Sequence, residues 1–115
     1  FTVKVRQRTE RTERPFEYEL GEIYPNPFNP TAHIRFSVPL DSRVNISIYS
    51  ALGEEVAILA DGVQHAGVHT VEWHGTRNDG ASVSSGVYFV RMIASPLEPG
   101  TGSSFTSVRK VLLMK

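Results

Sequence analysis

The chain has 115 residues, enough for about one domain, and its 12 Lys and Arg residues balance its 12 Asp and Glu residues. No basic excess favours nucleic-acid binding, no apolar run approaches the ~20 residues of a membrane helix, and the lack of cysteine excludes disulfides, Cys-ligated zinc and thiol catalysis. At 40% hydrophobic residues, the chain can bury one core without covalent cross-links.

The first part of the chain is rich in charge. Residues 1–22 hold five Lys or Arg and five Glu, whereas the rest of the chain holds only seven charges of each sign. Apolar and polar residues alternate over residues 1–6 and 16–20, which predicts a short strand in each segment. Residues 8–15 between them carry no apolar side chain and predict a solvated linker. The chain starts at Phe1 without a signal peptide, so we expect a piece of a longer protein.

A proline-rich segment follows this charged leader. Three prolines within six positions exclude a helix or a central strand, so the segment should be extended or turning, with Phe28 free to dock as an anchor. The segment consists of Tyr24, Pro25, Asn26, Pro27, Phe28, Asn29 and Pro30.

The rest of the chain predicts strands and turns. Val71 and Trp73 share the inward phase of their strand, which favours a core tryptophan over a sugar-binding one. Residues 87–93 are apolar on both faces, which suits the middle of a sheet. Loops are predicted over 61–67 and 96–104. Counting one leader strand, this pattern predicts an all-β sandwich of about seven strands. The six strands expected here are 32–38, 43–49, 55–59, 68–74, 87–93 and 105–114.

No group of residues in the sequence predicts an active site or a metal site. The four histidines lie on outward strand phases or in turns, and the acidic residues lie mostly in turns, so neither a metal site nor a carboxylate pair is predicted. No nucleophile elbow or phosphate loop is present. Tyr49 and Tyr88 stay open as partners for Trp73 in an aromatic platform. We therefore expect no enzyme activity and no cofactor. The histidines are His33, His65, His69 and His74.

Five motifs in order resemble the type IX secretion system C-terminal sorting domains of type A. They are the 24–31 segment with its following strand, residues 46–56, Ala-Gly-Val-His at 66–69 with Trp-His-Gly at 73–75, Gly80 with Ser-Gly-Val-Tyr-Phe at 85–89, and a basic-flanked apolar tail. His74 departs from the acid usual in the family, and the 96–104 loop is long. The matching positions are Tyr24, Pro25, Asn26, Pro27, Phe28, Asn29, Pro30, Gly53, Gly67, Trp73, Gly75, Gly80, Gly86 and Tyr88.

The resemblance implies an immunoglobulin-like sandwich with a non-catalytic role. Residues 1–23 would be the end of a cargo module and a linker, and residues 24–115 the sorting domain. Such domains direct cargo of Gram-negative bacteria through the periplasm and across the outer membrane by the type IX machinery. A surface sortase then typically removes the domain, here inside residues 7–23, and links the cargo to lipopolysaccharide. We expect a monomer that ends on the cell surface or is secreted.

The last strand is the expected recognition surface, together with the 80–88 turn. An exposed edge there could pair with a receptor strand, while the flanking lysines would guard it from aggregation. The proposed residues are Lys110, Val111, Leu112, Leu113, Met114 and Lys115. Two alternatives stay open at this point. One is an immunoglobulin-like structural or spacer domain similar to those of flagellar hook-capping proteins, and the other is a carbohydrate-binding module of a secreted glycosidase.

Overall fold

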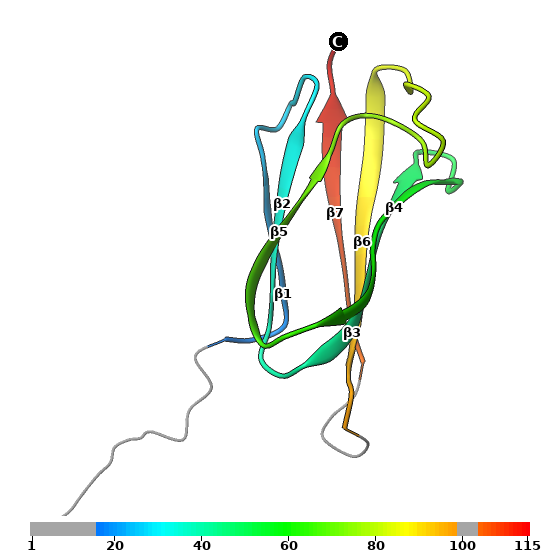
Figure 1. Ribbon diagram of the computed structural model, residues 1–115. Coiled ribbons are helices and arrows are strands. Elements are labelled where there is room, and N and C mark those ends of the chain that lie inside the picture. Colours follow the sequence, from blue (N-terminus) through cyan, green and yellow to red (C-terminus); the bar gives the residue numbers. More distant parts are fainter. Residues whose placement is uncertain (1–15, 99–103) are drawn as a thin grey trace, which may run out of the picture.

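The computed structural model describes residues 16–98 and 104–115, which form a sandwich of two antiparallel sheets (Figure 1). One sheet has the strand order β1-β2-β5 and the other β4-β3-β6-β7. The predicted class, an all-β immunoglobulin-like antiparallel sandwich of about seven strands, is confirmed. The strand and linker predicted within residues 1–15 lie outside the described residues. The strands are β1 (Glu19–Tyr24), β2 (Ala32–Val38), β3 (Ser42–Ser50), β4 (Glu55–Gln64), β5 (Gly67–Trp73), β6 (Gly86–Pro96) and β7 (Phe105–Leu113).

Alternating side chains build the core between the sheets. Along β2 the buried side chains include Ile34 and Phe36, and along β3 they include Ile46 and Ile48. Strand β6 lies between β3 and β7 and turns Val90, among others, fully inward. Successive residues of a strand point to opposite faces, so this alternation turns one face of each sheet toward the other sheet. The six strands predicted after residue 31 are all present.

Strand β1 starts later and ends later than the sequence predicted. It covers Glu19–Tyr24 rather than 16–20, and its pairing with β2 is irregular between Leu20 and Ile23. This bulge lets both of these side chains reach the core although they are three positions apart. A Cβ at Gly21 would lie 3.0 Å from the carbonyl oxygen of Arg35, so the glycine permits the close approach.

Strand β4 also extends beyond its prediction. It runs to Gln64 and pairs with β3 up to Ser42, so the loop expected over 61–67 was wrong for its first four residues. Asp61 and Gly62 are poor strand formers, but tertiary pairing at the edge of a sheet overrides such local preferences. The remaining turn is closed by Asp41, whose Oδ1 accepts a hydrogen bond of 2.9 Å from the amide of Ala66, and this bond lowers the pKa of Asp41.

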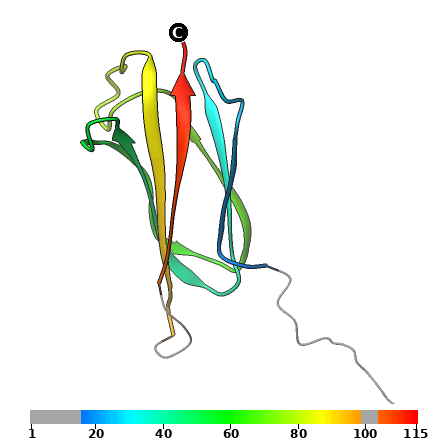
Figure 2. The ribbon, with the colours of Figure 1, turned by 180° about the vertical axis from the view of Figure 1, so that it is seen from behind.

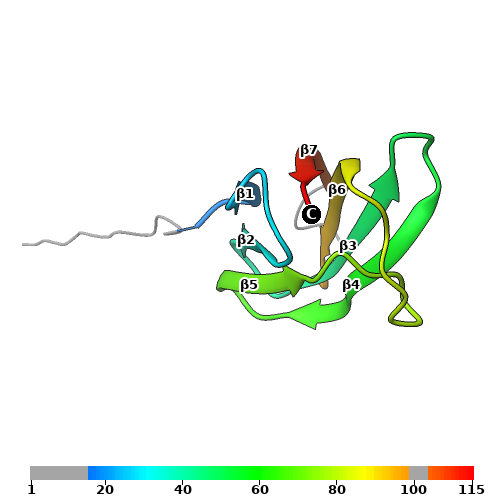
Figure 3. The same cartoon turned by 90° about the horizontal axis from the view of Figure 1, so that it is seen from above.

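The first and last described strands lie side by side. β1 and β7 face each other across one side of the sandwich, where the two sheets come together (Figures 2 and 3). The predicted domain boundary between residues 23 and 24 stays a prediction, and β1 runs across it. The buried side chains of Leu20 and Ile23 therefore belong to the sandwich core.

Candidate recognition site at the C-terminal strand

The proline-rich segment forms a strap along the outer edge of β7; we call residues 25–30 the strap. Phe28 donates a backbone hydrogen bond of 2.9 Å to the carbonyl of Leu112, and its own carbonyl accepts one of 3.0 Å from the amide of Met114. Phe28 and Leu113 thus form a parallel bridge. The Phe28 ring is 1% exposed, which confirms its predicted role as an anchor.

Asn26 continues this ladder with its side chain. Its Oδ1 accepts a hydrogen bond of 3.1 Å from the amide of Leu112, and its Nδ2 donates one of 3.3 Å to the carbonyl of Lys110. In a regular parallel ladder, a backbone amide and carbonyl at this position would make both bonds. The carboxamide of Asn26 therefore takes the place of a peptide group in the ladder, two residues before Phe28.

Removing this carboxamide should loosen one end of the strap. We expect Asn26→Ala to lower the free energy of unfolding by about 1–2 kcal/mol, because two hydrogen bonds of ordinary strength are lost. The amide of Leu112 should also exchange faster with deuterium, which NMR can follow residue by residue. Asn29→Ala is the matched control, since Asn29 lies in the same strap without a side-chain hydrogen bond to the described residues. Unchanged protection at Leu112 would contradict the assignment.

An aromatic cluster lies beneath the strap. The ring of Trp73 is 5.3 Å from that of Phe28 and 5.1 Å, edge-on, from that of Tyr88. The indole Nε1 donates a hydrogen bond of 2.9 Å to the carbonyl of Thr76, and the Tyr88 hydroxyl donates one of 2.6 Å to the carbonyl of Ser84. Both polar tips are therefore satisfied while the rings are buried. The predicted core position of Trp73 is confirmed.

Gly75 lets the cluster close against β7. Its φ of +71° is unfavourable for other residues, and a Cβ there would lie 3.3 Å from Cδ2 of Leu113. A glycine is therefore favoured at position 75 both by the positive φ and by the close approach of the Leu113 side chain. The other predicted glycine positions lie in a turn, in a loop or at the start of a strand, without a close neighbour at the Cβ position; they are Gly53, Gly67, Gly80 and Gly86.

The segment predicted for recognition has an inner and an outer face. Val111 and Leu113 are buried, whereas Lys110, Met114 and Lys115 are exposed. Leu112 is half-buried. The expectation of an exposed strand edge was wrong from the carbonyl of Lys110 to the amide of Met114, because the strap already pairs with these outward backbone groups. Recognition of these residues by a partner stays a prediction.

The predicted surface histidines lie along β2, β5 and the adjoining turns. Glu72 Oε2 is 3.2 Å from Nδ1 of His33, and Glu72 Oε1 is 3.8 Å from Nε2 of His74. His69 stacks on Phe36. His65 lies 3.5 Å from a carboxylate oxygen of Asp41. Over residues 16–98 and 104–115, no three His, Asp or Glu side chains come together as a metal site.

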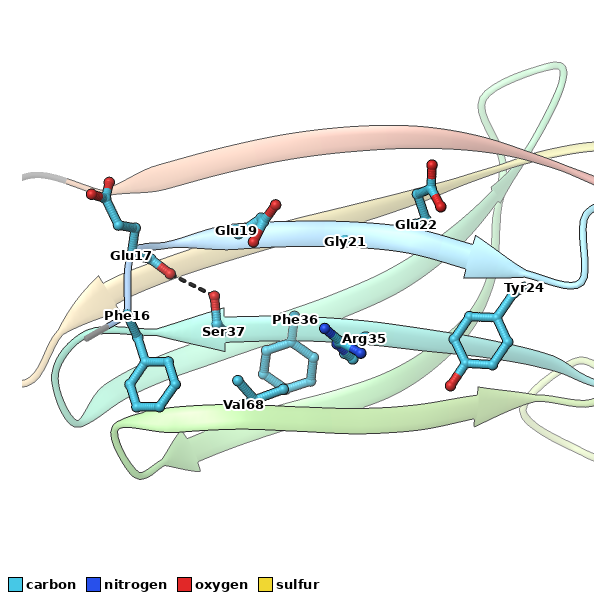
Figure 4. Close-up of a pocket in the computed structure, with 10 residues that line it drawn as sticks. All are labelled: Phe16, Glu17, Glu19, Gly21, Glu22, Tyr24, Arg35, Phe36, Ser37 and Val68. Atoms are coloured by element: carbon cyan, nitrogen blue, oxygen red, sulfur yellow. Dashed lines mark hydrogen bonds between the residues drawn. The ribbon is translucent and has the colours of Figure 1, made fainter. Parts of the chain in front are cut away.

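The aromatic platform considered for sugar binding is not assembled. Trp73 and Tyr88 are buried, and the guanidinium of Arg91 lies 4.7 Å above the ring centre of Tyr49. The exposed Tyr24 and the half-buried Phe16 lie elsewhere, at a hollow of about 470 Å³ on the outer face of β1 and β2. Figure 4 shows Phe16 and Tyr24 at opposite ends of this hollow, with Arg35 between them. Sequence reasoning missed it, because Phe16 was assigned to a strand face.

More than half of the chain matches one protein family. The family model of the FlgD Ig-like domain matches residues 28–96, which include the strap anchor, the aromatic cluster and β2 to β6. The chain belongs to this family. No curated protein matches the chain. In the part of the chain that the structure describes, no helix is long and apolar enough to cross a membrane.

Two solved structures share the fold of this FlgD Ig-like domain. One is dimeric latent PorU from Porphyromonas gingivalis, with a TM-score of 0.66 and 20% identity over 82% of this chain and 9% of that chain. The other is PorZ, described as an essential surface component of the type-IX secretion system of Porphyromonas gingivalis, with a TM-score of 0.51 and 22% identity over 82% of this chain and 11% of that chain. The chain thus spans about a tenth of either protein.

Proposed function

We propose that this FlgD Ig-like domain is a non-catalytic sorting signal that directs an exported cargo protein across the outer membrane by type IX secretion. One observation carries the proposal. Four of the motif residues that resemble type IX sorting domains come from distant parts of the chain and meet beside the C-terminal strand. The rings of Phe28, Trp73 and Tyr88 pack in one cluster, and Gly75 packs on Leu113. The fold likeness to PorZ, a component of that system, supports the same role.

The sandwich explains how such a signal can work without an active site. Its strands hold the last residues in a fixed geometry, so partner binding does not have to order them first. The outer-membrane machinery would bind this surface after the cargo reaches the periplasm. A surface sortase would then remove the domain and link the cargo to lipopolysaccharide.

The burial of β1 supports cleavage outside this strand. Strand β1 starts at Glu19, and its Leu20 and Ile23 side chains are buried, so a protease would have to pull apart the core to cut there. We therefore expect cleavage before Glu19, within residues 7–18 of the region first proposed. Mass spectrometry of the C-terminus of surface-bound cargo can locate the cut. An end beyond Tyr24 would contradict the proposal.

A reporter fusion tests the proposed function directly. Residues 7–115 placed behind a periplasmic reporter should bring the reporter to the surface of a type IX-competent host. The same fusion should stay in the periplasm of a host whose type IX machinery has been inactivated. Periplasmic retention in the competent host, with the domain folded, would refute the sorting role.

The family match favours a second candidate. A FlgD Ig-like domain could serve as a structural or spacer module between other parts of a longer protein. In that case the fusion would fold without being exported, and deletion of the domain would alter assembly of the parent protein. The fusion experiment therefore separates the two candidates.

A further inference from the structure

The edge of β7 is covered along only part of its length. The outward backbone groups of this strand belong to alternate residues, as the bonds to Lys110, Leu112 and Met114 show. The hydrogen bonds between the strap and β7 start at the carbonyl of Lys110, which accepts the bond from Nδ2 of Asn26. Upstream of Asn26 the chain leaves this edge, because Tyr24 pairs with His33 in β2.

The next positions of the ladder are therefore open. By the same alternation, the amide of Lys110 and both the carbonyl and the amide of Val108 point outward from β7. Among the described residues, these three groups have no hydrogen-bond partner. The Val108 side chain, which is 54% exposed, lies on the outer face of the sheet and leaves the edge accessible.

These groups face a cleft between β1 and β7. The cleft has a volume of about 620 Å³ and lies between the open edge and the β1 backbone. Arg109 crosses it and donates a hydrogen bond of 2.8 Å from Nε to the carbonyl of Leu20. The charged residues that line the cleft are Arg109, Lys110 and Glu22, so the lining has a net positive charge. Such a lining favours an acidic occupant.

We propose that an extended, acidic segment of a partner protein binds in this cleft as a strand parallel to β7. The segment extends the ladder that Asn26 and Phe28 begin. Its backbone bonds to the carbonyl and the amide of Val108 and to the amide of Lys110, while an acidic side chain lies near Lys110. The inference rests on the proposed function, in which the partner belongs to the outer-membrane secretion machinery. Strand addition at an open sheet edge is a general mode of peptide recognition.

A proline at position 108 tests this ladder. Val108→Pro removes one outward amide and fills its place with the proline ring, yet keeps every bond between β7 and β6, because the amide of residue 108 points away from β6. Val108→Thr is the matched control, since it changes the side chain and keeps the amide. In the reporter fusion, we expect Val108→Pro to reduce surface reporter about tenfold, as for the loss of main-chain bonds to a partner. Val108→Thr should leave export unchanged.

A charge reversal gives a second measurement that does not depend on the proline being tolerated. Lys110→Glu changes an exposed side chain, and we expect it to reduce export, with Lys110→Gln in between. Thermal unfolding of each purified variant checks that the domain is folded. If the unmodified fusion is exported and folded Val108→Pro and Lys110→Glu are exported equally well, the cleft inference is overturned while the sorting role stands. If the unmodified fusion itself is not exported, the proposed function fails.

Discussion

Phe28→Ala should lower the free energy of unfolding by about 3–5 kcal/mol, the usual cost of removing a fully buried aromatic side chain. The ring is 1% exposed and packs on Trp73 beneath the strap. Urea unfolding followed by tryptophan fluorescence measures the change. Tyr24→Ala serves as the control: its ring is 50% exposed, so the loss should be small. Equal losses in the two variants would contradict the anchoring role of Phe28.

The same variant should change how the molecules associate. Without its anchor, the strap can leave the edge of β7 and expose the backbone groups of Leu112 and Met114 that it now pairs. Open edges promote pairing between copies. Light scattering of Phe28→Ala should therefore show association that increases with concentration, whereas Tyr24→Ala should scatter light as the unmodified domain does. A Phe28→Ala variant that is folded and remains monomeric at high concentration would show that the strap still covers the edge.

Trp73→Ala should also cost about 3–5 kcal/mol, because it empties the centre of the aromatic cluster. Trp73→Phe keeps a ring between Phe28 and Tyr88 but loses the hydrogen bond to Thr76, so a smaller loss is expected. Circular dichroism must follow the unfolding, since Trp73 is the only tryptophan of the chain. If both variants lose the same stability, the indole hydrogen bond rather than the ring packing dominates.

Alternation of apolar and polar residues was enough to predict most of the fold. β2 covers the predicted residues 32–38, and Trp73 turns inward as its phase indicated. The strand boundaries that were predicted wrongly, those of β1 and β4, depend on features that leave no pattern in the local sequence. The bulge in β1 breaks the two-residue period between Leu20 and Ile23, and β4 continues through Asp61 only because β3 lies beside it.

The candidate site was predictable only in part. Its aromatic residues follow from burial phase and from the resemblance to sorting domains, and the anchoring of Phe28 follows from the rigidity of its neighbours. The function of Asn26 has no such signal, because a carboxamide acts as a peptide group only when the edge of β7 is beside it. For the same reason, the sequence suggested an open edge at Leu112, which the strap in fact covers.

The contact between the strap and β7 also affects the order of folding events in this domain. Asn26 and Leu112 are 86 positions apart, so their bond closes almost the entire described chain. Contacts of such separation form late, because the loop entropy must be overcome before they contribute. A chain shortened before Val111 lacks two core side chains and the partner of the strap. The sandwich can therefore be completed only after β7 has been translated. A chain that ends earlier cannot present the surface formed by β7 and the strap.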